Sequence, residues 1–179
     1  WSGIETATLS FGYGLSTTAL QLAQAYSVIA DGGIRKPVSL IKLDAKAIEE
    51  LPRDQVLSET ISNQVLAMLE TVVDPSRGGS ARDARVPFYK VAGKTGTVHV
   101  VGEFGYQDHV YNSLFVGLIP ASDPKLVVVV IINEPKGSEH YGGQVAAPVF
   151  SRVASGAMRL LNIAPDDVPV NQATELTLL

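Results

Sequence analysis

The residues with the clearest chemistry in this 179-residue sequence are Lys94-Thr95-Gly96-Thr97, which combine a cation, two hydroxyls and a residue without a side chain. They open an apolar, β-branched run, so we expect a strand. Side chains alternate between the two faces of a strand, which predicts Lys94 and Gly96 on one face and Thr95 and Thr97 on the other. Gly96 would let another backbone approach closely. At a strand edge, the free backbone N–H and C=O of Thr97 could bind a peptide-like ligand as an added strand, with Lys94 beside its carboxylate.

On its own, this short motif also fits a lysine and two threonines on a solvated strand, so the elements around it must decide between the two interpretations. The composition is that of a folded chain with a buried core: 46% of residues are hydrophobic and 18% charged, and the mean hydropathy is +0.19. The net charge is −4 and no Lys/Arg cluster occurs, which argues against nucleic-acid binding through phosphates. No apolar run is long enough for a transmembrane helix.

Cysteine and histidine usage limits the possible chemistry further. The sequence contains no cysteine, which excludes disulfides, thiol catalysis and thiolate zinc sites. The histidines are His99, His109 and His140, and the first two lack the i, i+4 spacing of a helical zinc pair. We therefore expect no metal site.

Periodicity and turn residues predict an α+β fold, in which helices pack on an antiparallel sheet. We expect Thr17 and Ser58 to be helix N-caps, Gly32-Gly33 to end the first helix, and Met68 to pack in the core. Residues 1–14 are predicted to be a loop and 102–108 a turn-rich connector. The last three strands should form a meander, with the strand at 126–132 fully buried and Pro148 in the first turn of the closing helix. The predicted helices cover residues 18–31, 58–73 and 144–162, and the predicted strands cover 37–43, 89–101, 111–119 and 126–132.

We expect residues 1–166 to belong to one compact domain and residues 167–179 to be a tail. The sequence begins at Trp1 without a start methionine, so we expect it to be a piece of a longer protein.

Four motifs together resemble a known family. They are Phe11-Gly12-Tyr13-Gly14-Leu15-Ser16-Thr17-Thr18, the K-T-G-T run, the stretch from Tyr111 to Pro120, and Tyr141-Gly142-Gly143 before the closing helix. The K-T-G triplet belongs to the signature of penicillin-binding proteins and serine β-lactamases. The whole set resembles the C-terminal part of the transpeptidase domain of class B penicillin-binding proteins, of the division-specific penicillin-binding protein 3 type.

The resemblance implies a fold and an activity. The fold would be an incomplete transpeptidase fold of the penicillin-binding protein and serine β-lactamase kind. The activity would be that of a peptidoglycan D,D-transpeptidase, which cross-links stem peptides during septal cell-wall synthesis through a serine acyl-enzyme and is the target of β-lactam antibiotics. The implied partners are the D-Ala-D-Ala stem peptide, β-lactams and the lipid-II polymerase of the divisome. The implied location is the periplasmic face of the inner membrane at the septum, with the membrane anchor outside this chain and no cofactor.

The resemblance also implies roles for particular residues. Lys94 would support proton transfer and a positive potential, Thr95 and Thr97 would bind the ligand carboxylate, and the Thr97 backbone would supply an oxyanion-hole N–H. Gly96 would allow close approach of the ligand. His140 and Tyr141 would form an aromatic wall beside it, and His99 stands where relatives often carry arginine.

One departure from the family pattern is large. The family signature also needs S-x-x-K, which carries the nucleophile, and S-x-N, and the family places both before the equivalent of Trp1. We therefore expect neither partner motif, and no nucleophile, within these 179 residues. Two alternatives stay open: a fragment of a serine β-lactamase or D,D-carboxypeptidase, and a non-catalytic penicillin-sensor domain.

Overall fold

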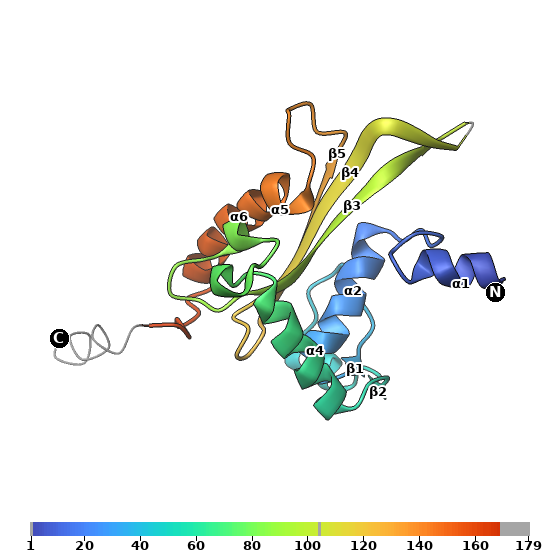
Figure 1. Cartoon of the computed structure of the whole chain (residues 1–179). Helices are drawn as coiled ribbons and strands as arrows, with labels where there is room; N and C mark the ends of the chain where they lie inside the picture. The colour runs from blue at the N-terminus through green and yellow to red at the C-terminus, as the bar shows by residue number, and fades with distance from the viewer. Residues whose placement is uncertain (1, 104, 169–179) are drawn as a thin grey trace.

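The computed structural model of the chain describes residues 2–103 and 105–168. Its elements confirm the predicted α+β class, with helices first, then a three-strand sheet, then a closing helix (Figure 1). In chain order the elements are α1 (Gly3–Leu9), α2 (Ala19–Ala30), β1 (Ile34–Arg35), α3 (Ala45–Glu49), β2 (Asp54–Gln55), α4 (Glu59–Thr71), the 3₁₀ helices η1 (Pro75–Arg77) and η2 (Arg82–Ala84), β3 (Ala92–Gly102), β4 (Gly105–Ile119), β5 (Leu126–Asn133), α5 (Gly142–Val145) and α6 (Ala147–Leu160).

The main sheet has the strand order β3-β4-β5 with antiparallel pairing throughout, which confirms the predicted meander. Thr97 pairs with Ser113 and Lys94 with Val116 across β3 and β4. The turn-rich connector predicted at 102–108 is wrong, because pairing continues to Gly102 and Gly105 after a register shift between His99 and Val101. Extended backbone pairing outweighs the local turn signals there, and Gly105 takes the positive φ of +118° at the turn.

Helices cover both faces of the sheet, with α5 and α6 on one side and α2 and α4 on the other (Figure 1). On the first side, Phe115 of β4 meets Phe150 of α6 edge to face, with ring centroids 4.9 Å apart and both side chains fully buried. On the second side, Leu118 and Ala92 pack with Leu69 of α4. The sheet is therefore the middle layer of a three-layer core.

The ends of the helices follow local capping chemistry. Thr18, and not the predicted Thr17, is the N-cap of α2: its side chain accepts from the Gln21 N–H, and the Gln21 side-chain oxygen accepts from the Thr18 backbone N–H. Ser58 caps α4 as predicted, and Pro148 lies in the first turn of α6. The loop predicted at 1–14 is partly wrong, because a capping box between Ser2 and Glu5 begins α1.

Three other predictions fail because tertiary contacts override local pattern. The segment 37–43 is not a strand; Leu40 is 89% exposed, and the short strand β1 lies before this segment, where it pairs with β2. Met68 is 60% exposed, because Ser62 and Leu69 take the buried face of α4. The strand β5 is only partly covered, with Val130 as its one buried residue.

The stretch after α6 begins with attachments to the body of the domain. The Tyr89 hydroxyl donates to the carbonyl oxygen of Ile163 at 2.6 Å. The Asp166 carboxylate accepts from the Lys90 backbone N–H at 2.8 Å and from the Ser122 hydroxyl at 2.6 Å. One side chain thus joins the start of β3 to the β4–β5 turn. Most of the predicted tail, residues 169–179, lies outside the described residues.

Replacing Asp166 by alanine in the complete protein is expected to lower the free energy of unfolding by about 1–2 kcal/mol, because three hydrogen bonds to the carboxylate are lost at a partly exposed site. Chemical denaturation measures the change. Asp167→Ala is the matched control, since Asp167 bonds to Phe88 through its backbone N–H. Equal stabilities for the two variants would contradict this role of Asp166.

Candidate binding and active site

The K-T-G-T stretch lies on β3, and the structure gives its side chains the predicted alternation. Thr95 pairs with Phe115 and Thr97 with Ser113, so both threonines lie on the face that packs against α5 and α6. A Cβ at Gly96 would meet the Leu114 side chain on the opposite face. Thr95 and Thr97 are half-buried.

Each threonine hydroxyl has a defined partner from a different part of the chain. The Thr95 hydroxyl lies 3.2 Å from the Ser80 hydroxyl. The Thr97 hydroxyl accepts from the backbone N–H of Gly142 at 3.1 Å. The loop before η2, the strand β3 and the start of α5 therefore meet at one point. Sequence reasoning did not select Ser80, whose only signal was its place in a glycine-rich loop just before η2.

The backbone N–H of Thr97 faces the outer edge of β3. The His99 N–H donates to the Tyr13 hydroxyl at 3.3 Å, so it is directed to a group outside the β3–β4 pairing. Backbone N–H groups two residues apart on a strand point to the same edge. The N–H of Thr97 is thus directed to the edge at which an extended ligand could add.

Lys94 is exposed, and its ammonium donates to the carbonyl oxygen of Thr95 at 2.9 Å. This places a positive charge at the start of the edge that carries Thr95 and Thr97. Negative groups that approach this edge are therefore attracted.

The predicted wall residues His140 and Tyr141 lie in a row of rings that contact one another. His140 stacks on Tyr111 with centroids 4.2 Å apart and an interplanar angle of 14°. Tyr141 follows at 4.4 Å from His140, and His99 lies on the other side at 4.5 Å from Tyr111. The His99 Nδ1 lies 3.1 Å from the Gln107 carbonyl oxygen. A carbonyl only accepts, so this nitrogen carries the hydrogen.

Sequence reasoning did not single out Tyr111 as part of this row of rings. Its signal was the two-residue alternation along β4, which puts Tyr111 on the same face as Ser113. Tyr111 is paired with His99 across β4 and β3.

The prediction that no S-x-x-K spacing occurs in the chain is wrong. The spacing occurs at Ser39–Lys42 and at Ser122–Lys125. The Ser39 hydroxyl donates to the Ile41 carbonyl beyond β1. Ser122 lies just past the end of β4, and its hydroxyl donates to Asp166.

Both serines lie towards the other end of the sheet from Thr97, because Pro37 and Val38, next to Ser39, line a pocket with Pro124 and Lys125, next to Ser122. The pair Ala92–Leu118 at the Ser122 end of the sheet is five residues along β3 from the pair Thr97–Ser113, which is roughly 16 Å of strand. The S-x-N triplet does not occur in the sequence.

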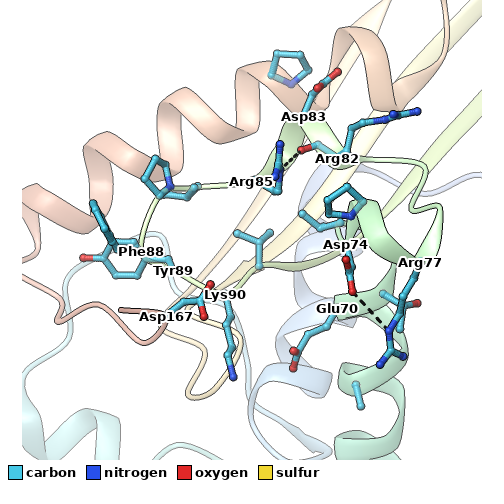
Figure 2. A pocket seen from close by; sticks show the side chains of 18 residues that line it. Glu70, Asp74, Arg77, Arg82, Asp83, Arg85, Phe88, Tyr89, Lys90 and Asp167 are labelled. Carbon is cyan, nitrogen blue, oxygen red and sulfur yellow. Dashed lines mark hydrogen bonds and ion pairs between the residues drawn. The ribbon is translucent and has the colours of Figure 1, made fainter. Parts of the chain in front are cut away.

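A cleft of about 1030 Å³ lies elsewhere, between the C-terminal end of α4, the two 3₁₀ helices and the segment before β3 (Figure 2). It has side chains of both charges, and Arg77 pairs with Asp74 at 3.5 Å. Hydrogen bonds from the Ser76 side chain and backbone, with a smaller contribution from Arg77, lower the pKa of Asp74. None of the K-T-G-T residues lines this cleft, so we place the candidate site at β3.

Within residues 2–103 and 105–168, no group of three or more His, Asp or Glu residues is arranged to hold a metal ion. In the same part of the chain, none of the helices combines the length and apolar character needed to cross a membrane.

Comparison with known proteins agrees with this geometry. Residues 1–155 match the family described as the penicillin binding protein transpeptidase domain. The chain therefore belongs to the penicillin-binding protein transpeptidase family. It is 44% identical over 171 residues to a probable peptidoglycan D,D-transpeptidase, PbpC, of Pseudomonas aeruginosa, with 94% of this chain and 29% of that protein covered. It is 40% identical over 178 residues to the peptidoglycan D,D-transpeptidase FtsI of Escherichia coli, with 99% of this chain and 29% of that protein covered.

A solved structure gives the same assignment. The apo transpeptidase domain of Burkholderia pseudomallei penicillin-binding protein 3 superposes with a TM-score of 0.84 at 41% identity, and the match covers 94% of this chain and 50% of that domain's chain. The chain thus spans less than a third of the length of these two relatives and about half of the solved transpeptidase chain.

Gly142→Ala is expected to disrupt this face, because an added Cβ would collide with the backbone oxygens of Leu114 and Gly96. The loop must then shift, and the bond from Gly142 to Thr97 is lost. We expect the complete protein to lose about 2 kcal/mol or more of folding free energy, measured by thermal or chemical unfolding.

The matched control is Gly156→Ala in α6, where an added Cβ meets nothing within 4 Å. Alanine favours helix, so this variant should gain about 0.5–1 kcal/mol. A Gly142→Ala protein as stable as the wild type would show that the close approach of backbones at this residue is absent.

Proposed function

We propose that the protein containing this chain is a peptidoglycan D,D-transpeptidase that cross-links stem peptides in septal cell-wall synthesis and is acylated by β-lactams. The observation that carries the proposal is the β3 edge, where the two threonine hydroxyls, a backbone N–H directed outward and the Lys94 ammonium lie together. Membership of the transpeptidase family supports it. We further propose that residues 1–166 belong to the transpeptidase domain and that residues 167–179 are its tail.

The proposed chemistry is acyl transfer through a serine. The serine oxygen attacks the carbonyl carbon between the two D-Ala residues, the terminal D-Ala leaves with a proton on its amine, and an amine of a second stem peptide then takes the acyl group. This chain would contribute the binding and electrostatic half of the site. The serine would come from the part of the transpeptidase domain that these residues do not include.

Each residue of the edge has a role suited to its chemistry. Thr95 and Thr97 would donate their hydroxyl hydrogens to the terminal carboxylate of the stem peptide or of a β-lactam. The Thr97 N–H would bind the oxyanion that forms during attack. Lys94 would stabilise negative charge and favour proton transfer, and Gly96 would leave room for the ligand backbone.

The ring row would form one wall of the site. His140 and Tyr141 directly precede Gly142, whose N–H donates to the Thr97 hydroxyl. A side chain of a ligand bound at Thr97 would therefore lie near these two rings. Tyr141 is 59% exposed, which leaves apolar ring surface free for such contact.

We propose the same setting for the complete protein as for a division transpeptidase. It would act at the periplasmic face of the inner membrane, anchored by a segment outside this chain, with the lipid-II polymerase of the divisome as its partner. Co-purification of that polymerase with the complete protein from membranes tests this partner. If the polymerase does not co-purify, the partner is rejected and only the enzymatic part of the proposal remains.

Thr97→Val in the complete protein removes one hydroxyl and keeps the side-chain shape. Loss of a hydrogen bond to a charged group costs about 1.5–3 kcal/mol, so we expect the second-order rate of acylation by benzylpenicillin to fall about 10- to 100-fold. Mass spectrometry of the acyl-enzyme over time measures the rate.

Thr71→Val is the control for this experiment, because the Thr71 hydroxyl donates to Met68 within α4 and has no part in the site. We expect its acylation rate to match the wild type. A Thr97→Val protein that is acylated at the wild-type rate would reject the role of this hydroxyl.

The 179 residues alone are expected to form no covalent adduct with benzylpenicillin, since neither Ser39 nor Ser122 lies at the Thr95–Thr97 face. Intact-mass measurement after incubation tests this, with the complete protein as the positive control. A stable adduct on the isolated chain would place the nucleophile within it and would overturn the division of the site proposed above.

A further inference from the structure

The loop between β5 and α5, residues 134–141, is fastened to β4 at both of its ends. At its start, the Glu134 N–H donates to the Tyr111 carbonyl oxygen at 2.9 Å. At its end, the Ser113 hydroxyl donates to the carbonyl oxygen of His140. Tyr111 and Ser113 are two residues apart on β4, so their side chains lie on one face. The loop that carries His140 and Tyr141 is thus held at its start by the backbone of β4 and at its end by a β4 side chain.

Ser113 and Thr97 belong to the same closed ring of contacts. They are paired across β4 and β3. The Ser113 hydroxyl holds the His140 carbonyl, and two residues further on the Gly142 N–H donates to the Thr97 hydroxyl. The position of that N–H therefore depends on where Ser113 holds the loop.

The Gly142 bond decides what the Thr97 hydroxyl can offer a ligand. A hydroxyl has one hydrogen and two acceptor lone pairs. Because one lone pair of Thr97 accepts from Gly142, the hydrogen remains free to be donated. A carboxylate only accepts, so this arrangement prepares Thr97 for an anionic ligand.

We propose that Ser113 is a positioning residue for carboxylate recognition: its buried hydroxyl fixes the His140 carbonyl and thereby sets the Gly142 N–H that orients the Thr97 hydroxyl. This inference rests on the proposed function, since it assumes that Thr97 binds the ligand carboxylate. Ser113 is fully buried and touches no ligand itself, so its effect passes through the loop.

The chain contains a matched control for a buried serine. Ser62 of α4 is also fully buried, and its hydroxyl donates to the Ile29 carbonyl of α2 at 2.8 Å. Ser62→Ala removes the same kind of bond on the other side of the sheet. A merely structural loss should therefore look alike in the two variants.

The experiment measures acylation of the complete protein by benzylpenicillin and by its methyl ester, which lacks the negative charge. The ratio of the two rates cancels general losses of stability and of nucleophile reactivity. For Ser113→Ala we expect the acid-to-ester ratio to fall about fivefold relative to the wild type, with a smaller change in the ester rate than in the acid rate. Ser62→Ala should keep the wild-type ratio.

Ser113→Cys is the second variant, nearly equal in shape and with a weaker donor. Its ratio is expected between those of the wild type and of Ser113→Ala, and it decides the matter if the alanine variant does not fold. A wild-type ratio in both Ser113 variants would overturn the positioning role. If benzylpenicillin does not acylate the wild-type protein, the proposed function is rejected, and the role of Ser113 is rejected as well because it rests on that function.

Discussion

The contact of bare backbone at Gly142 and Gly143 is the constraint on which the candidate site depends. A Cβ at Gly142 would collide with the backbone oxygens of Leu114 and Gly96, and a Cβ at Gly143 would collide with the backbone carbonyl oxygen of Ser80. Two residues without side chains therefore let the start of α5 lie directly against β3, β4 and the loop before η2. Any larger residue would separate these segments, and the hydroxyl partners of the two threonines would separate with them.

Close packing at that point gives the site its chemistry. The Thr97 hydroxyl accepts from the Gly142 N–H, which leaves its hydrogen for a ligand, and the Thr95 hydroxyl lies beside the Ser80 hydroxyl. Preorganised donors bind a developing or fixed negative charge without the cost of turning towards it. The Lys94 ammonium adds an attractive field at the same strand edge. The two layers of helices keep the strand rigid, because the sheet is covered on both faces.

Local chemistry in the sequence accounts for much of the fold. The caps at Thr18 and Ser58 and the β-branched runs of the meander needed only short-range preferences. The missed Thr18 cap and the missed capping box of α1 are local, but the other failures occur where long-range contact decides. Met68 had helical spacing but lies on the exposed side of α4, and Leu40 lay in a β-like segment that found no partner strand. Which side of a helix is covered, and which strand has a neighbour, depends on residues far away in the chain.

The sequence by itself determined the family, the strand that carries Lys94-Thr95-Gly96-Thr97 and the alternation of its side chains, because periodicity and motif are local properties. Only the tertiary structure could decide the partners of those side chains. Ser80, Ser113 and Gly142 lie 14 to 48 positions from Lys94 in the chain, and no spacing rule connects them to the motif. They meet it because the meander folds back on itself and the glycine pair lets the next helix approach.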